Sequence, residues 1–338
     1  MPNHADRQFG IEIVGVGAHA PENVLTNKDL EGMMDTSDEW IQQRTGIKQR
    51  HKADLENGET VLHLAKGALE KALADAKTDA SELDLVLLAT MSSEMTCPPT
   101  ACRLTSMIGA GNAGAWDISA ACCGFVFAMN TAYGLMQTGP YRNVAVIGAD
   151  TLTKSVEFST RGRGAAILFG DAAAGVIIKR TEDTSKGLIA QAMHSDGSRW
   201  SDLYIPETKH DLTEDDRQSN DQLCVLHMNG AGVFRFAVGT FPQVIGQTLE
   251  AAGITADEVD HFVCHQSNQR ILQAAKERFG LPDEKLHVNI DRFGNTVAAS
   301  VPLVLNDLRE AGRVEKGQKV MFVGFGGGLT WGTSLWQI

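Results

Sequence analysis

Short apolar runs that end at glycine or polar residues alternate along this chain with longer segments whose apolar residues have helical spacing. Residues 11–17 (IEIVGVG) and 83–91 (LDLVLLATM) have the composition of buried strands, whereas residues 59–76 (ETVLHLAKGALEKALADA) repeat apolar side chains at helical intervals. Further strand-like runs lie at residues 143–149, 175–180, 261–265 and 319–326. This order of strands and helices predicts an α/β fold built in layers.

One polar stretch, Pro206–Gln222, interrupts this pattern. Its sequence, PETKHDLTEDDRQSNDQ, consists almost entirely of charged, amide and hydroxyl side chains, and the chain has no low-complexity tract. We predict a loop-like surface insertion here.

The chain contains an internal repeat with a constant offset, which pairs the segment from Ala74 with the segment from Glu250. The same offset pairs the segment from Asn143 with the one that begins after Gln318. Residues that are identical at this offset are Ala76 and Ala252, Ala80 and Ala256, Glu82 and Glu258, Asp84 and Asp260, Val144 and Val320, and Gly148 and Gly324. One unbroken offset over about 75 residues indicates two similar α/β halves, and we predict a boundary that separates residues 1–180 from 181–338.

Composition narrows the class of protein. The chain has 338 residues, of which 43% are hydrophobic and 21% charged, as in a soluble globular protein with a large core. It has no apolar run long enough to cross a membrane, and its first residues lack the pattern of a signal peptide. Six cysteines are too sparse for a secreted disulfide scaffold, so we expect a reducing cytoplasm. The net charge of −12 argues against general nucleic-acid binding, and an acidic partner would need a local basic patch.

The repeat also brings candidate catalytic residues together. Its offset takes Cys122 to Ala298, so Cys122 and Asn295 occupy nearly equivalent places in the two halves, each where a loop enters an apolar helix. His265 ends the strand-like run 261–265. Because ligands of open α/β sheets collect at the carboxyl ends of strands, we expect these three side chains to converge on one interface.

Other kinds of site have weaker support. The stretch GFGGGLTWG (324–332) lacks the Lys-Ser/Thr of a phosphate loop and is followed by a strand-like run, while GVGAHAP (15–21) is followed by polar residues, so neither predicts nucleotide binding. The stretch CPPTAC (97–102) has no matching His or Cys pair, so no metal site is predicted. A cysteine hydrolase stays open as an alternative, since papain-like proteases use Cys, His and Asn in this order, although their CGSCW-like motif is absent.

Six stretches in order resemble the signatures of one family. They are TSDEWIQQRTGI (36–47), DISAACCGF (117–125), FGDAAAG (169–175), HQSNQRI (265–271), DRFGNTVAASVP (291–302) and FGGGLTWG (325–332). Together they are similar to the β-ketoacyl-acyl-carrier-protein synthase III family, the initiating condensing enzymes of bacterial fatty acid synthesis. The resemblance implies the thiolase fold, an αβαβα sandwich of two duplicated halves, and a homodimer. It also implies a decarboxylative condensation of an acyl-CoA starter with malonyl-carrier protein through an acyl-cysteine intermediate.

The resemblance gives roles to the converging residues. It makes Cys122 the nucleophile and leaves Cys123 as a small core residue. A thiol at a helix N-terminus is expected to have a lowered pKa, because the helix dipole and free N–H groups stabilise the thiolate. His265 and Asn295 complete a Cys-His-Asn triad, in which neutral His Nε2–H and the Asn amide stabilise the enolate formed on decarboxylation. The backbone N–H groups of Cys122 and Gly327 resemble the family's oxyanion hole.

Coenzyme A is the implied acyl donor, as a thioester substrate and with no cofactor besides it. Trp40, Arg44 and Arg163 fall on family positions that stack on adenine or line its entrance, and Asn268 falls on one that contacts the pantetheine arm. The alternative is that Trp40 packs a helix while the arginines form surface ion pairs.

The resemblance further implies an acidic carrier protein as partner. Arg235 and Arg270 are candidate docking residues, although Glu277 stands where the family often has a lysine. The stretch around Cys97 aligns with the segment that reaches the partner subunit's acyl pocket, where acetyl-preferring members often have a bulky aromatic residue. The small Cys97 therefore predicts use of medium or long acyl-CoA, unless another side chain closes the same space.

Two close alternatives share the fold. One is a starter-unit synthase of a secondary, polyketide-type pathway, and the other is an acyltransferase that forms no carbon–carbon bond. A non-catalytic binding homologue is disfavoured, because every triad position is filled.

Overall fold

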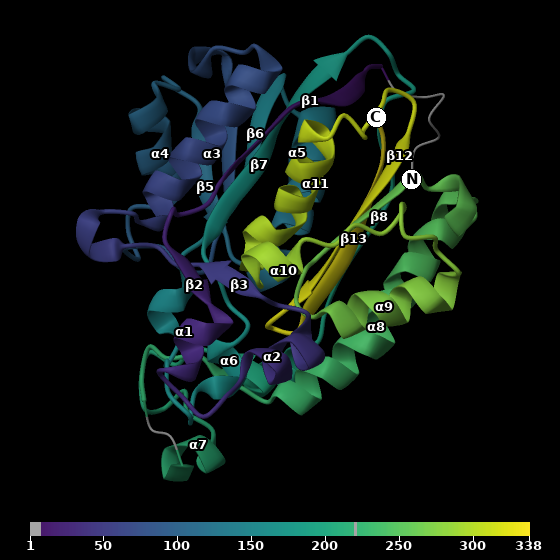
Figure 1. Ribbon diagram of the computed structural model, residues 1–338. Helices are drawn as coiled ribbons and strands as arrows, with labels where there is room; N and C mark the ends of the chain where they lie inside the picture. Colours follow the sequence, from purple (N-terminus) through teal and green to yellow (C-terminus); the bar gives the residue numbers. More distant parts are fainter. Residues whose placement is uncertain (1–7, 220–221) are drawn as a thin grey trace.

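The computed structural model describes residues 8–219 and 222–338, with two main sheets at its centre (Figure 1). The first sheet has the strand order β1-β7-β6-β4-β5, antiparallel from β1 to β6 and parallel from β6 to β5. The second has the order β11-β12-β13-β8, in which only β11 and β12 are parallel. Their strands are β1 (Gly10–His19), β4 (Leu85–Ala89), β5 (Gly114–Ile118), β6 (Asn143–Asp150), β7 (Ala172–Thr181), β8 (Gly187–Ser195), β11 (His261–Cys264), β12 (Lys319–Gly326) and β13 (Thr330–Gln337). Each strand-like run named from the sequence overlaps one of these strands.

Helices form the layers outside and between the sheets. Helices α3 and α4 cover the outer face of the first sheet, α8 and α9 cover the outer face of the second, and α5 and α11 lie between the two (Figure 1). The helices are α1 (Asn27–Glu31), α2 (Asp38–Thr45), α3 (Val61–Ala76), α4 (Thr100–Ile108), α5 (Gly124–Thr138), α6 (Arg163–Ala166), α7 (Glu214–Ser219), α8 (Gly230–Ala252), α9 (Gln269–Phe279), α10 (Ile290–Phe293) and α11 (Ser300–Glu310). The predicted αβαβα sandwich is confirmed.

The sequence repeat recurs in the structure. Strands β6 and β12 start and end at the offset of the repeat, and so do the short turns η4 (Ala121–Cys123) and η8 (Val297–Ala299), which precede α5 and α11. The order β1-β7-β6-β4 in one sheet matches β8-β13-β12-β11 in the other. One apolar core contains α5, α11 and strands of both sheets, so the two halves are packed together. A division into domains at residue 180 stays a prediction.

The polar stretch 206–222 is not entirely a loop. It contains the short helix α7, whose first turn is capped where the Asp216 backbone N–H donates to Thr213 Oγ1 at 3.1 Å. This corrects the prediction of a loop-like insertion. The helix gave no signal in the sequence because it contains no apolar residues. The stretch connects the two strands of a small ribbon, β9 (Leu203–Tyr204) and β10 (His227–Met228), while β2 (Val24–Thr26) and β3 (Gln49–His51) form another.

No helix in the described part of the chain is both long and apolar enough to cross a membrane.

Candidate active site

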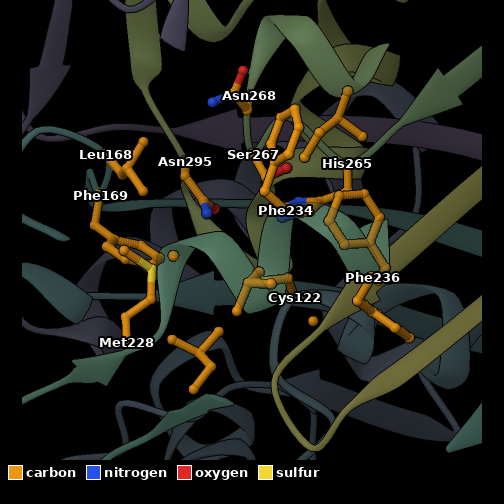
Figure 2. Close-up of a pocket in the computed structure, with 16 residues that line it drawn as sticks. Cys122, Leu168, Phe169, Met228, Phe234, Phe236, His265, Ser267, Asn268 and Asn295 are labelled. Carbon is orange, nitrogen blue, oxygen red and sulfur yellow. The ribbon is translucent and has the colours of Figure 1, made fainter. Parts of the chain in front are cut away.

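Cys122, His265 and Asn295 line a single cavity, as the sequence predicts (Figure 2). The cavity lies at the carboxyl ends of β11 and β12, where His265 follows β11 and Gly326 ends β12. The three side chains come from residues that are only 4%, 1% and 4% exposed, respectively. The cavity is narrow, with a volume of about 90 Å³.

Two of the three residues, Cys122 and Asn295, are positioned by turns with a strained backbone. Cys122 belongs to turn η4 at the start of α5, and the preceding Ala121 has φ 46°. The counterpart of Ala121 in the second half is Val297, which follows Asn295 by two positions and has φ 54°. A β-branched residue with positive φ is a clear outlier, and such strain costs about 1–3 kcal/mol. Equivalent strained turns therefore aim the thiol and the amide from opposite halves of the molecule.

Burial overturns the expected activation of the Cys122 thiol. Its position at the start of α5 agrees with the sequence, but desolvation, together with the negative charge of Asp150, raises the pKa of Cys122 to about 12. Its own backbone N–H and the Asn295 side chain oppose this rise only in part. The expectation of a lowered pKa is thus wrong, because the helix terminus acts in a site from which water is excluded.

His265 is held in its neutral form. Burial lowers its pKa to about 3, and the ring packs edge-on against Phe325 with centroids 5.1 Å apart. Its backbone N–H donates to Val323 O at 2.8 Å, which connects the residue to β12. Its Nδ1 is buried without a partner among the described residues, so no hydrogen bond at Nδ1 fixes the tautomer. A neutral ring can donate a hydrogen bond to a developing oxyanion, as the sequence analysis requires.

The amide of Asn295 is oriented by its own turn. Asn295 Oδ1 accepts from the Val297 N–H at 3.0 Å, so the –NH₂ end is the one left to face Cys122. The backbone of Asn295 bridges to the first half, since its N–H donates to Leu168 O at 2.8 Å and its carbonyl accepts from Gly170 N–H at 3.0 Å. The amide therefore reaches the site as a hydrogen-bond donor.

Asp150, at the end of β6, is a buried charge that sequence reasoning missed. It is 0% exposed, and one oxygen accepts from the Met91 N–H at 2.9 Å, Ser92 Oγ at 2.9 Å and Thr90 Oγ1 at 3.2 Å. The other oxygen accepts from the Ala298 N–H in η8 at 3.2 Å. Desolvation, partly offset by these donors, raises its pKa to about 6. Its place at the carboxyl end of a parallel strand was a signal that could have identified it.

Replacing Asp150 by asparagine is expected to make Cys122 more reactive. At about pH 8 the carboxylate is ionised and raises the pKa of Cys122, so its removal increases the thiolate fraction, tenfold for each unit by which the pKa falls. The reactivity of Cys122 is measured as its pseudo-first-order rate of alkylation by iodoacetamide, followed by mass spectrometry. The gain should disappear below about pH 6, where Asp150 of the parent is itself protonated.

Asp171→Asn is the matched control for that measurement. Asp171 is an equally buried carboxylate that accepts from Thr153 and Ala53, and it is not among the groups that shift the Cys122 pKa. Equal alkylation rates for parent and Asp150→Asn, or an equal gain in Asp171→Asn, would refute the proposed electrostatic effect.

The glycine-rich loop packs directly on the cysteine. Gly326 lies against Cys122, because a Cβ there would be 2.7 Å from Cys122 N and 3.0 Å from Cys122 Cβ. A Cβ at Gly327 would have more space, because its nearest neighbour would be Leu203 O at 3.3 Å. The structure thus adds Gly326 as the residue that permits the close approach, and the oxyanion role of the Gly327 N–H stays a prediction.

The residues predicted to bind coenzyme A cluster around Trp40. The guanidinium of Arg163 lies 4.8 Å from the centroid of the Trp40 ring, and that of Arg44 lies 5.4 Å from it. Asn268 lines the cavity, but its side chain also caps α9, accepting from the Arg270 N–H at 2.9 Å and donating to Arg44 O at 3.0 Å. The four predicted residues are therefore in one region, and Asn268 has a structural task besides any contact with a ligand.

The predicted docking and gate residues lie outside the cavity. Arg235 and Arg270 are exposed, and Arg270 lies over Phe234, which lines the cavity, at 5.1 Å from its centroid. Cys97 is also exposed, in the segment just before α4. Exposure leaves these three free to meet a partner, and their roles stay predictions.

Apolar side chains missed from the sequence form much of the wall. Leu203 and Met228 come from the ribbon β9–β10, and Phe169, Phe234 and Phe236 approach from other elements. No periodic pattern marks the two ribbon residues, because each strand has only two residues. The cavity therefore combines an apolar wall with a thiol, an imidazole and an amide.

Comparisons with known proteins agree with this arrangement. Family models for 3-oxoacyl-[acyl-carrier-protein] synthase III and for its C-terminal part match residues 116–197 and 249–338. The chain is 42% identical to the β-ketoacyl-[acyl-carrier-protein] synthase III of Geobacillus kaustophilus, over 96% of this chain and 97% of that protein. The crystal structure of the Aquifex aeolicus synthase III matches with a TM-score of 0.89 and 38% identity, covering 97% of this chain and all of that one. The priming β-ketosynthase of the R1128 polyketide pathway matches at 0.87 and 31%, covering 98% and 97%.

Proposed function

Because this chain belongs to the 3-oxoacyl-[acyl-carrier-protein] synthase III family and is a condensing acyltransferase of that kind, we propose that Cys122 carries the acyl group and that His265 and Asn295 drive decarboxylation. The observation that carries the proposal is the single narrow cavity that holds all three side chains. Family membership also removes the cysteine hydrolase from consideration.

The first half-reaction transfers an acyl group from coenzyme A to Cys122. The raised pKa means that the resting group is a thiol, so it must lose its proton as sulfur attacks the thioester carbonyl. The tetrahedral oxyanion is stabilised by the N–H groups of Cys122 and Gly327. The carbon–sulfur bond to coenzyme A then breaks, and the departing thiolate takes up one proton. Acyl-CoA and the Cys122 thiol are thereby converted to acyl-Cys122 and free coenzyme A.

The second half-reaction forms the carbon–carbon bond. The malonyl group on the carrier protein loses carbon dioxide, and the electron pair moves into an enolate whose oxygen accepts from His265 Nε2–H and Asn295 Nδ2–H. The enolate carbon attacks the acyl-Cys122 carbonyl, and collapse of the oxyanion expels the sulfur of Cys122, which takes up one proton from solvent. Neutral His265 suits this role, because the lowered pKa keeps the ring uncharged and a neutral ring still has one N–H to donate.

Substrate recognition follows from the surroundings of the cavity. Trp40, Arg44 and Arg163 present an aromatic face and two cations for the adenine and phosphates of coenzyme A. Arg235 and Arg270 offer exposed positive charge to an acidic carrier protein. The proposed chemistry uses no group besides the two thioester substrates, and a cytoplasmic location stays a prediction.

Mass spectrometry of the intact protein tests the proposal. Incubation with acetyl-, octanoyl- or dodecanoyl-CoA should add the mass of one acyl group at Cys122, and later addition of malonyl-carrier protein should release carbon dioxide and β-ketoacyl-carrier protein in equal amounts. Hydrolysis without an adduct would overturn the proposal, and an adduct without carbon dioxide would favour the acyltransferase that forms no carbon–carbon bond.

The similarity to a priming ketosynthase keeps a second candidate function, the starter-unit synthase. Both enzymes would perform the same two half-reactions, so the carrier protein distinguishes them. A higher kcat/KM with a polyketide-type carrier than with a fatty-acid carrier would favour the starter-unit synthase.

Replacing Cys97 by phenylalanine is expected to narrow the acyl-chain range. We include in the proposal a homodimer in which Cys97 closes the acyl pocket of the partner subunit, so a larger side chain there shortens the space for the chain. Each methylene that loses its buried site costs about 0.8 kcal/mol, so kcat/KM for dodecanoyl-CoA should fall at least about tenfold while that for acetyl-CoA stays unchanged.

Cys102→Phe is the matched control, as Cys102 is also exposed and lies in the same stretch of chain. An unchanged profile for Cys97→Phe, or a parent that strongly prefers acetyl-CoA, would show that Cys97 is not the gate.

A further inference from the structure

The ribbon β9–β10 has two faces with different surroundings. Leu203 pairs with Met228 and both line the cavity beside Cys122, whereas Tyr204 pairs with His227 and neither lines it. Successive side chains of a strand point to opposite faces, so the second pair faces away from the cavity. Whatever holds Tyr204 and His227 thereby sets the position of the apolar wall formed by Leu203 and Met228.

Asp216 on α7 collects the polar groups of this outer face. Its carboxylate accepts from the hydroxyl of Tyr204 and from Thr213 Oγ1 at 2.7 Å, and its Oδ1 lies 3.3 Å from His227 Nδ1. Burial raises the pKa of Asp216, but the donors Tyr204, Thr213 and His227 together outweigh it and hold the pKa below its usual value. An ionised carboxylate of the polar insertion 206–222 thus contacts both outer residues of the ribbon, Tyr204 and His227.

Both ring nitrogens of His227 face acceptors. Nδ1 faces the Asp216 carboxylate and Nε2 lies 3.0 Å from Gln222 O, while the ring stacks on Tyr204 with centroids 5.0 Å apart. A neutral imidazole carries only one N–H, so only the imidazolium donates to both acceptors. The residue is buried, at 5% exposure, and its two partners belong to the polar insertion.

We propose that Asp216 and His227 are positioning residues that latch the ribbon β9–β10 and thereby limit the length of acyl chain that the cavity accepts. The cavity has a volume of only about 90 Å³, so we expect a long chain on Cys122 to displace the wall of Leu203 and Met228. On the other side of Met228 is a polar hollow of about 250 Å³ lined by Asp216 and His227, into which that wall can retreat. The latch opposes this movement. The proposal rests on Cys122 as the site of acylation.

Asp216→Asn tests the latch through the ratio of kcat/KM for dodecanoyl-CoA to that for acetyl-CoA. Loss of the charge weakens the contacts with Tyr204, Thr213 and His227, so this ratio should rise about tenfold, in proportion to one charge-assisted hydrogen bond. Tyr204→Phe, which removes one donor and keeps the ring, should raise the ratio less. Asp215→Asn is the matched control, because Asp215 is the exposed neighbour on the same helix.

The separate kcat/KM values provide a second readout. The latch restricts only long acyl chains, so kcat/KM for acetyl-CoA should keep its parental value in Asp216→Asn while kcat/KM for dodecanoyl-CoA rises. A merely structural role of Asp216 would instead lower kcat/KM for both acyl-CoAs.

The outcomes separate this proposal from the function on which it depends. An unchanged ratio in Asp216→Asn, or an equal rise in Asp215→Asn, overturns the latch while acylation of Cys122 continues. If the parent acquires no acyl group on Cys122, the proposed site of acylation fails instead. Circular dichroism of each variant shows whether a change in the ratio reflects loss of the fold, and a folded Tyr204→Phe variant with the parental ratio also contradicts the latch.

Discussion

Cys122→Ser should abolish acyl transfer, whereas Cys123→Ala should retain it. A serine hydroxyl ionises far less readily than a thiol, and the burial that raises the pKa of Cys122 to about 12 would disfavour an alkoxide still more. Thioester exchange also depends on sulfur as both nucleophile and leaving group. The rate of acyl-enzyme formation should therefore fall below detection in intact-mass measurements that resolve the parent reaction within minutes.

Cys123 is the internal control for that result. It is 0% exposed, belongs to the core shared by both sheets and packs against β12, where a Cβ built at Gly324 would lie 3.1 Å from its sulfur. Its removal leaves a small void, with an expected stability loss of about 1 kcal/mol and no direct effect on the cavity. An acyl adduct on Cys123 in a tryptic digest would contradict this assignment.

The fold was predictable because its main signals are local. The apolar runs of β6 and β12 and the helical spacing of α3 are each determined by a few neighbouring residues, and the internal repeat connects distant segments without any knowledge of contacts. Helix α7 was missed for the complementary reason. Its sequence, EDDRQS, has no apolar face, and the helix depends on a local cap and on contacts with the ribbon.

The residues of the site could be predicted from the sequence, but their pKa values could not. Sequence placed Cys122 at a helix start, but its pKa depends on how tightly Gly326 and η8 close around the sulfur and on the charge of Asp150. Such desolvation is a property of tertiary packing, which no local pattern reports. The pairing of Asp216 with His227 depends likewise on how the insertion folds back on the ribbon.

His265→Ala and Asn295→Ala should each nearly stop decarboxylation of malonyl-carrier protein. Either change removes one of two donors to the enolate oxygen in a site that water scarcely enters, and loss of one such donor costs on the order of 100- to 1000-fold. Release of labelled carbon dioxide from malonyl-carrier protein measures this step. Ser267→Ala is the matched control, because Ser267 lines the same cavity and its buried hydroxyl has no partner in the described part of the chain.

Acylation of Cys122 should survive both substitutions, but not equally. The Asn295 side chain helps to lower the pKa of Cys122, whereas His265 is not among the groups that shift it, so Asn295→Ala should slow acylation more than His265→Ala does. Single-turnover acylation followed by intact mass separates this step from condensation. If His265→Ala removed acylation as completely as condensation, the thiol would need His265 as its base. That outcome would require the buried imidazole to accept a proton despite a pKa lowered to about 3, so it would also show that substrate binding changes the environment of the ring.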